Sequence, residues 1–229
     1  MRYWVVDSET TGVGPQDKAV EIAGFLCEDN KIIRYYQTLV DPGIPIPPEA
    51  SMIHHLTDED VVGQPDIESA VTPFFDDEFD FVVAHQASFD KRMIPMGQAP
   101  WACSLKMARA VYPNAAMHKN MFLYYWLNLP KLVHSTGLSS HRALFDSEAT
   151  THLFQHLLSK ATTDDPIDSI IKLSNNPSLL KICQLNKHKG KLWADVPKDY
   201  LNWILNPRTP HPQPFDEDTV YTAKFYYER

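Results

Sequence analysis

The sequence predicts an α/β fold in which consecutive strands are followed by strands alternating with helices. Residues 2–6 (RYWVV), 19–27 and 32–40 are short apolar segments rich in β-branched and aromatic residues, which is typical of buried strands. The polar turn at 28–31 indicates a hairpin between the second and third of them. A later strand at 81–85 stands among segments of helical character, so we expect a mixed sheet with an antiparallel meander at one edge.

Helices are predicted around the later part of this sheet. Residues 66–75 form an amphipathic stretch, and 104–112 and 121–129 are interpreted as core helices. The last helix of this half starts near Ala143, because apolar residues recur four apart at Ala149, Leu153 and Leu157.

The remainder of the chain is predicted to form a small second unit. A polar stretch that ends on Pro166 marks a linker over 163–168, which separates a first domain of residues 1–162 from a module of residues 169–229. Within the module, we expect a helix over 193–205 and a final strand over 218–228.

Composition restricts the class of protein. With 44% hydrophobic and 22% charged residues among 229, the chain is neither disordered nor fibrous, and no apolar run approaches the length of a membrane span. The chain has three cysteines, far apart and without the spacing of a zinc site: Cys27, Cys103 and Cys183. We therefore expect reduced thiols and a cytoplasmic protein. The net charge of −8, all of it within residues 1–161, argues against a passive polyanion binder.

The tripeptide Asp7-Ser8-Glu9 follows the first predicted strand. Two carboxylates two residues apart in extended chain point the same way and can share a hard cation. Ligands in open α/β sheets bind beyond the carboxyl ends of strands. The alternative is an ordinary acidic loop.

Two further acidic segments follow in the chain. Asp90 lies shortly after the strand at 81–85. The alternative interpretation is an ordinary helix start, in which Ser88 caps the helix and Asp90 complements its dipole. His141 precedes Asp146 by five residues at the start of the last helix, and the alternative there is a surface histidine beside a dipole-compensating acid. Together the segments supply four carboxylates and one base, which is the set that two-metal phosphoryl chemistry needs.

The three segments DSETTG, HQASFD and HRALFD resemble the three motifs of the DEDDh (DnaQ-like) family of 3′→5′ exonucleases. IHHLT at 53–57 is similar to a further family segment, and the resemblance covers residues 2–160. PSL at 177–179 and LNKHKGK at 185–191 resemble a tail that most family members lack. The resemblance implies a ribonuclease H-like mixed sheet flanked by helices, with a small C-terminal module.

The resemblance also implies roles for individual residues. Asp7, Glu9 and Asp146 would bind the catalytic metal, with Asp7 shared by a second ion that Asp90 holds through water. His141 would be the general base that activates the attacking water, since its ordinary pKa lies near neutrality. Oxygen-only ligation points to two Mg²⁺ or Mn²⁺ ions.

Substrate contacts are implied at the same motifs. Backbone groups of Thr10, Thr11 and Gly12 would line the terminal nucleotide, and Val13 stands where the family usually has a leucine wedge. Two further candidates for contact with the terminal sugar or base are His54 and Phe89, although a core position for Phe89 is equally open. Two departures from the family pattern are Ser8 in place of threonine, expected to be harmless, and Gln86 in place of asparagine.

The tail carries a lysine cluster at Lys187, Lys189 and Lys191, and residues 169–194 contain five lysines and no acid. A solvated turn and a phosphate-contacting clamp for DNA are both open interpretations. Three aromatic residues of the module would stack on bases or, at helical spacing, belong to its core: Trp193, Tyr200 and Trp203.

These features predict a metal-dependent 3′→5′ exodeoxyribonuclease that releases 5′-mononucleotides in DNA repair or end-trimming. Single-stranded or duplex DNA is the expected partner, no membrane is expected, and monomer and homodimer both remain open. The alternatives are an RNA-directed exoribonuclease of the same fold, a polymerase proofreading subunit and, from a different class, a non-catalytic nucleic-acid-binding adaptor.

Overall fold

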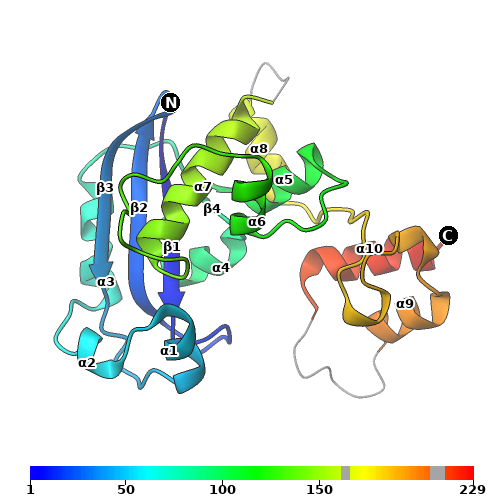
Figure 1. Ribbon diagram of the computed structural model, residues 1–229, viewed down its shortest axis with the longest axis horizontal. Coiled ribbons are helices and arrows are strands. Elements are labelled where there is room, and N and C mark those ends of the chain that lie inside the picture. Colours follow the sequence, from blue (N-terminus) through cyan, green and yellow to red (C-terminus); the bar gives the residue numbers. More distant parts are fainter. Residues whose placement is uncertain (161–165, 207–214) are drawn as a thin grey trace.

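The computed structural model of the chain describes residues 1–160, 166–206 and 215–229. One five-stranded sheet has the order β3-β2-β1-β4-β5, with β1, β2 and β3 antiparallel and β1, β4 and β5 parallel (Figure 1). The predicted mixed sheet with an antiparallel meander at its edge is confirmed. The strands are β1 (Arg2–Thr10), β2 (Ala19–Glu28), β3 (Lys31–Leu39), β4 (Phe81–Ala84) and β5 (Trp101–Cys103).

The first strand is longer than the apolar segment that predicted it. β1 continues through Asp7 and Glu9, which pair with Ala23 and Glu21 of β2, so both acids lie within the ladder rather than after it. The predicted hairpin between β2 and β3 turns at Asp29 and Asn30, whose φ angles of 47° and 63° match the twist of flanking strands. β5 is only three residues long, too short for a periodicity signal.

Helices cover both faces of the sheet. The predicted last helix of the first domain is α7 (Ala143–Leu158), which packs through Leu153 and Phe154 on the face of β1 that carries Tyr3 and Val5. The alternate residues of β1, Trp4 and Val6, pack on the opposite face. The other helices of this domain are α1 (Pro48–His54), α2 (Asp58–Val61), α3 (Ile67–Ala70), the 3₁₀ helix η1 (Thr72–Phe75), α4 (Ala87–Met93), α5 (Ser104–Val111) and α6 (Asn120–Trp126).

Helix α8 (Pro166–Ser174) falls on the predicted linker and the start of the predicted module, but it packs with the first domain. Ile170 is 5% exposed and shares a core with Val83 and Leu153. The Ser174 hydroxyl accepts a hydrogen bond from the Cys103 backbone at 2.7 Å. We propose that the first domain extends to Ser174; residues 163–165 of the predicted linker lie outside the described residues.

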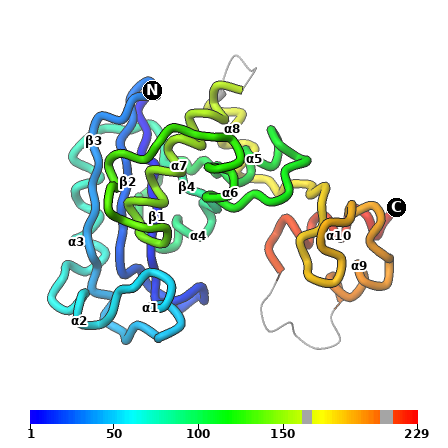
Figure 2. The backbone as a smooth tube through the Cα atoms, viewed as in Figure 1, coloured from blue at the N-terminus to red at the C-terminus, as the bar shows by residue number. Residues whose placement is uncertain are grey.

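The rest of the chain forms the C-terminal module, set beside the first domain (Figure 2). Its core contains Cys183, Trp193, Val196, Leu201, Ile204 and Ala223. Its helices are η2 (Asn186–His188), η3 (Trp193–Asp195), α9 (Lys198–Leu205) and α10 (Glu217–Tyr227). Pro197, at the start of α9, divides the helix predicted over 193–205 into η3 and α9.

The prediction of a final strand over 218–228 is wrong, because this segment is α10. The Asp216 carboxylate caps the helix by accepting from the Thr219 backbone at 2.9 Å. Thr219, Thr222 and Ala223 lie on one buried face at helical spacing. Capping and periodicity therefore outweigh the β propensity of the valine, threonine and tyrosine residues.

All three cysteines are buried free thiols, as predicted. Among the described residues, no helix is both long and apolar enough to cross a membrane.

Candidate active site

Three of the predicted metal ligands converge at the carboxyl end of β1. Asp7 and Glu9 project from the same face of the strand because they are two residues apart. Asp146 joins them from the first turn of α7, and one carboxylate oxygen from each residue lies within 4.8 Å of the others. All three are half-buried, so the cluster presents oxygen ligands of the kind that a hard divalent cation binds.

Asp90 reaches the same region from α4 but stands apart from that group of three. Its side chain is 3% exposed, and the Ser8 hydroxyl donates a 2.8 Å hydrogen bond to its Oδ1. The charge of Asp90 raises the pKa of Asp7, which places the two carboxylates within electrostatic reach. Ser8 therefore holds Asp90, and its replacement of the family's threonine stays a change expected to be harmless, because threonine carries the same hydroxyl.

The four carboxyl groups disfavour one another's charge. Burial, followed by repulsion from Asp90, Asp146 and Glu9, raises the pKa of Asp7 well above its ordinary range. Burial and Asp146 raise the pKa of Glu9 to about 8, and burial raises the pKa of Asp90 to about 7. Burial also raises the pKa of Asp146. A divalent cation would relieve this repulsion, so the donor set fits the predicted Mg²⁺ or Mn²⁺.

His141 lies in the loop that enters α7. Its φ of 66° places it in the left-handed region, and its backbone N–H donates to Asp146 Oδ2 at 2.7 Å. The side chain of His141 is exposed. This arrangement ties the predicted base to a predicted metal ligand through one hydrogen bond.

An ion pair that the sequence analysis missed fixes the start of α7. Glu21 of β2 is fully buried and accepts from the Arg142 guanidinium at 2.7 and 3.0 Å and from the Ala143 backbone at 2.9 Å. The Gln37 side chain donates a further bond at 2.6 Å. Because Glu21 pairs with Glu9 across the strands, it connects the metal-binding strand to the helix that carries Asp146. The available signal was a lone acid within the apolar segment AVEIAGFLC.

The loop after β1 is held by a carboxylate. Asp17 accepts from the Thr11 hydroxyl at 2.9 Å and from the Gly14 backbone at 2.7 Å. A Cβ atom on Gly12 would lie 2.6 Å from an oxygen of Asp17, so any larger residue there would push this carboxylate away from its partners. Val13 projects from this loop with 71% of its surface exposed, as a wedge would.

Two hydrogen bonds from Arg92 of α4 hold the loop that follows β1. Arg92 donates to the carbonyl oxygens of Val13 and Gly14, both at 3.3 Å, and its guanidinium lies 5.3 Å from the centre of the Phe89 ring. Phe89 is partly buried and packs against the core of the first domain. Sequence reasoning missed Arg92, which lies two positions after Asp90, the last residue of the second motif.

The remaining predicted contacts of this domain differ in accessibility. His54 is 2% exposed, and its Nδ1 accepts from the Leu56 backbone at 3.0 Å. Thr10 is also buried, and its hydroxyl bonds the Gly12 carbonyl at 2.7 Å. This burial favours positioning roles for His54 and the Thr10 side chain over direct contact.

Gln86 precedes the first residue of α4 with a φ of 71°, a conformation that asparagine adopts more readily, so the departure from the family pattern adds strain.

In the module, all three lysines of the predicted cluster are exposed. The Lys187 ammonium lies 5.4 Å from the centre of the Tyr200 ring. Trp193 is 1% exposed and belongs to the module core, whereas Trp203 is 43% exposed and stacks on Tyr200. The DNA contacts predicted for Lys187, Lys189 and Lys191 stay a prediction.

Comparison with known proteins places this site in a family. A family model described as an exonuclease matches residues 4–154. Exodeoxyribonuclease 10 of Escherichia coli (strain K12) is 34% identical over 205 residues, which are 88% of this chain and 90% of the relative. A PolC-type DNA polymerase III of Halalkalibacterium halodurans is 31% identical over 175 residues, which are 71% of this chain and 12% of that protein.

Solved structures agree with this assignment. Exonuclease X in complex with 5′ overhanging duplex DNA matches with a TM-score of 0.68 and 32% identity, covering 76% of this chain and 99% of that chain. A 3′-exonuclease that recognises a histone mRNA stem-loop matches with a TM-score of 0.57 over 70% of this chain and 82% of its own, but at 14% identity it shows the fold alone.

The predicted ribonuclease H-like sheet flanked by helices is thereby confirmed, as is the resemblance to the DEDDh family of exonucleases. The chain belongs to the exonuclease family.

Proposed function

We propose that this exonuclease removes 5′-mononucleotides from the 3′ end of DNA with two divalent cations, Mg²⁺ or Mn²⁺, and serves repair or end-trimming. The observation that carries the proposal is the convergence of carboxylate oxygens of Asp7, Glu9 and Asp146 within 4.8 Å, with the backbone N–H of His141 bonded to the Asp146 carboxylate. The DNA preference is supported by the relatives named as exodeoxyribonucleases.

Each side chain has a task in this proposal. Asp7, Glu9 and Asp146 would hold one cation, and Asp7 together with Asp90, which Ser8 orients, would hold the second. Bound cations supply polarisation of the scissile phosphate and stabilisation of the leaving 3′ oxygen. His141 takes the proton from the attacking water, and its exposed imidazole can return that proton to solvent. Thr11, Gly12 and Val13 present backbone groups and an apolar tip to the terminal nucleotide.

A degradation assay tests the proposal. The protein is incubated with end-labelled single-stranded and duplex DNA and with RNA, with Mg²⁺ or with EDTA, beside the Asp7→Ala variant. We expect mononucleotides from DNA with Mg²⁺ and a loss of at least about 1,000-fold in the variant. Release from RNA but not DNA would support the RNA-directed alternative, and no release from any substrate would support the non-catalytic adaptor.

A further inference from the structure

The first domain and the C-terminal module enclose a cavity of about 530 Å³. The first domain contributes the end of β4 and the segment that leads into α6, and the module contributes the chain around the basic turn 183–191. Among the residues that line it, Lys119 comes from the first domain and Lys181 and Lys189 come from the module.

The charge around this cavity is opposite in sign to that of the whole chain. In the part of the chain that the structure describes, none of these three exposed lysines forms an ion pair. One carboxylate, that of Asp216, also lines the cavity, and it is bonded to the backbone and hydroxyl of Thr219. The chain as a whole has a net charge of −8, so this local cation excess is a specific feature of the surface.

Some residues that line the cavity are neighbours of the metal-binding region. His85 and Gln86, at the end of β4, line it immediately before the helix that carries Asp90. Asn120 also lines it, and its side-chain amide donates to the Asp146 carbonyl at 3.0 Å. These lining residues place the cavity beside the elements that carry Asp90 and Asp146.

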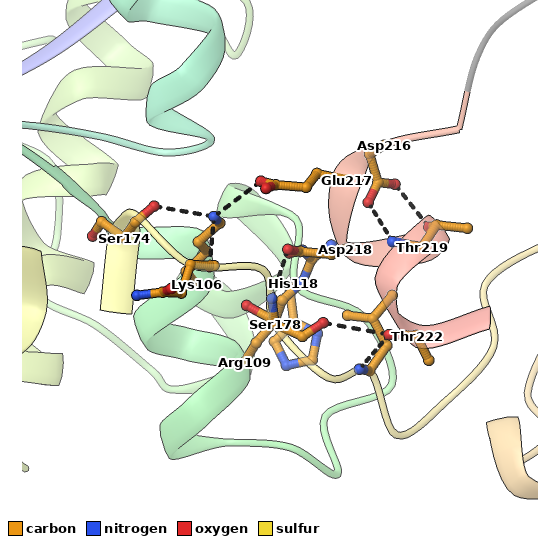
Figure 3. A network of polar contacts seen from close by, with 12 residues as sticks. Lys106, Arg109, His118, Ser174, Ser178, Asp216, Glu217, Asp218, Thr219 and Thr222 are labelled. Atoms are coloured by element: carbon orange, nitrogen blue, oxygen red, sulfur yellow. Dashed lines mark hydrogen bonds and ion pairs between the residues drawn. The ribbon is translucent and has the colours of Figure 1, made fainter. Parts of the chain in front are cut away.

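Ion pairs between α5 and α10 fix the two walls (Figure 3). Arg109 pairs with Asp218, whose carboxylate is 3% exposed and also accepts from the Ser178 backbone at 2.7 Å. Lys106 lies 3.6 Å from Glu217 and donates to the Ser174 carbonyl at 3.0 Å. The chain segments that carry the three lysines are therefore held relative to each other before any ligand arrives, which lowers the entropy cost of binding.

We propose that this cavity is a second nucleic-acid subsite, in which Lys119, Lys181 and Lys189 contact the phosphates of a single strand leading away from the active site. The inference rests on the proposed function, since the metal cluster anchors that strand. Apolar side chains between the lysines, among them Leu105 and Leu185, suit unpaired bases and sugars, whereas a duplex exposes mainly charged backbone.

Binding measurements in the Asp7→Ala background test the subsite without degradation of the probe. Lys119→Gln, Lys181→Gln and Lys189→Gln are combined in one variant, and a matched control combines glutamine substitutions at three exposed lysines elsewhere: Lys31, Lys160 and Lys198. The dissociation constants for a labelled single-stranded 20-mer and for the corresponding duplex are measured by fluorescence anisotropy over a range of salt concentrations.

Each phosphate contact contributes about 0.7 to the salt slope of single-strand binding. We therefore expect the cavity variant to lose about 2 units of slope and about 100-fold in affinity at 0.1 M salt, and the control to change little. Equal loss in both variants, no loss in the cavity variant, or loss confined to duplex probes would overturn the proposal.

Hydrolysis of a thymidine 5′-monophosphate nitrophenyl ester, measured with Asp7 intact, separates the two proposals. We expect both lysine variants to cleave this ester at the wild-type rate, because it does not extend into the cavity. If the wild-type protein cleaves neither the ester nor DNA, the proposed function fails, whereas the binding comparison still decides the subsite.

Discussion

The Glu21 clamp at the start of α7 gives a quantitative prediction. In Glu21→Gln the buried carboxylate loses its charge, and Arg142, whose side chain is 26% exposed, loses its ionic partner. Breaking a fully buried pair costs about 3–5 kcal/mol. Because Arg142 keeps some contact with water, we expect a loss of about 2 kcal/mol, equivalent to about 4–8 °C in the unfolding midpoint of a chain of this size.

The same substitution changes the metal site in a defined direction. The Glu21 charge raises the pKa of Glu9, so its removal lowers that pKa from about 8 and favours the ionised ligand. At pH 7 we expect the variant to bind Mn²⁺ at least as tightly as the wild type in titration calorimetry. Cleavage slows nevertheless, because the segment from His141 to Asp146 is no longer fixed.

A surface pair supplies the control for this reasoning. Arg34 and Asp77 lie 2.7 Å apart, but their side chains are 33% and 27% exposed. Asp77→Asn is expected to cost less than about 1 kcal/mol and to leave cleavage unchanged. If Glu21→Gln lowers the unfolding midpoint no more than Asp77→Asn does, Glu21 does not stabilise α7 and the reasoning is refuted.

Three further predictions follow from the site and the interface. Without metal, the raised pKa of Glu9 means that the folded protein binds more protons than the unfolded chain, so its stability falls as pH rises from 4.5 to about 8. Asp7→Asn removes one of the repelling charges and should raise the metal-free melting temperature at pH 8. A lower melting temperature in this variant would contradict the reasoning. Arg92→Ala should slow release from blunt duplex ends about fivefold by freeing the Val13 loop, whereas equal slowing on single strands in the same gel assay would exclude a wedge role. Asp218→Asn should cost about 2 kcal/mol and speed limited proteolysis between α8 and α10, and a wild-type cleavage rate would show that the ion pair does not hold the module.

The predictable parts of the fold were those with local signals. Apolar segments identified β1 to β4, and the two acids at spacing two in β1 identified Asp7 and Glu9 as a pair. Their approach to Asp146 depends on α7 crossing the sheet, which only the resemblance to a family implied. α10 was mistaken for a strand because its cap at Asp216 was not weighed against residue propensity.

The residues that support the site were not predictable in the same way. Glu21 and Arg142 are 121 positions apart, and neither lies in a recognisable pattern with the other. Arg92 binds backbone carbonyl oxygens, which every residue type has, so the side chain of Val13 gives no sign of this contact. Such long-range polar contacts are decided by tertiary packing, and single-sequence periodicity does not report them.

Helix α8 and the Arg109–Asp218 pair determine how truncation of the chain would affect the first domain. A chain ending at residue 165 would lose Ile170 from the core beneath β4 and would leave Arg109, whose Nε is buried, without its carboxylate. Such a fragment would be damaged within its remaining domain, and its reduced activity would say little about DNA contact. Within the C-terminal module, Asp218 supports the first domain through Arg109, and substitutions on the module surface separate that support from nucleic-acid binding where deletion does not.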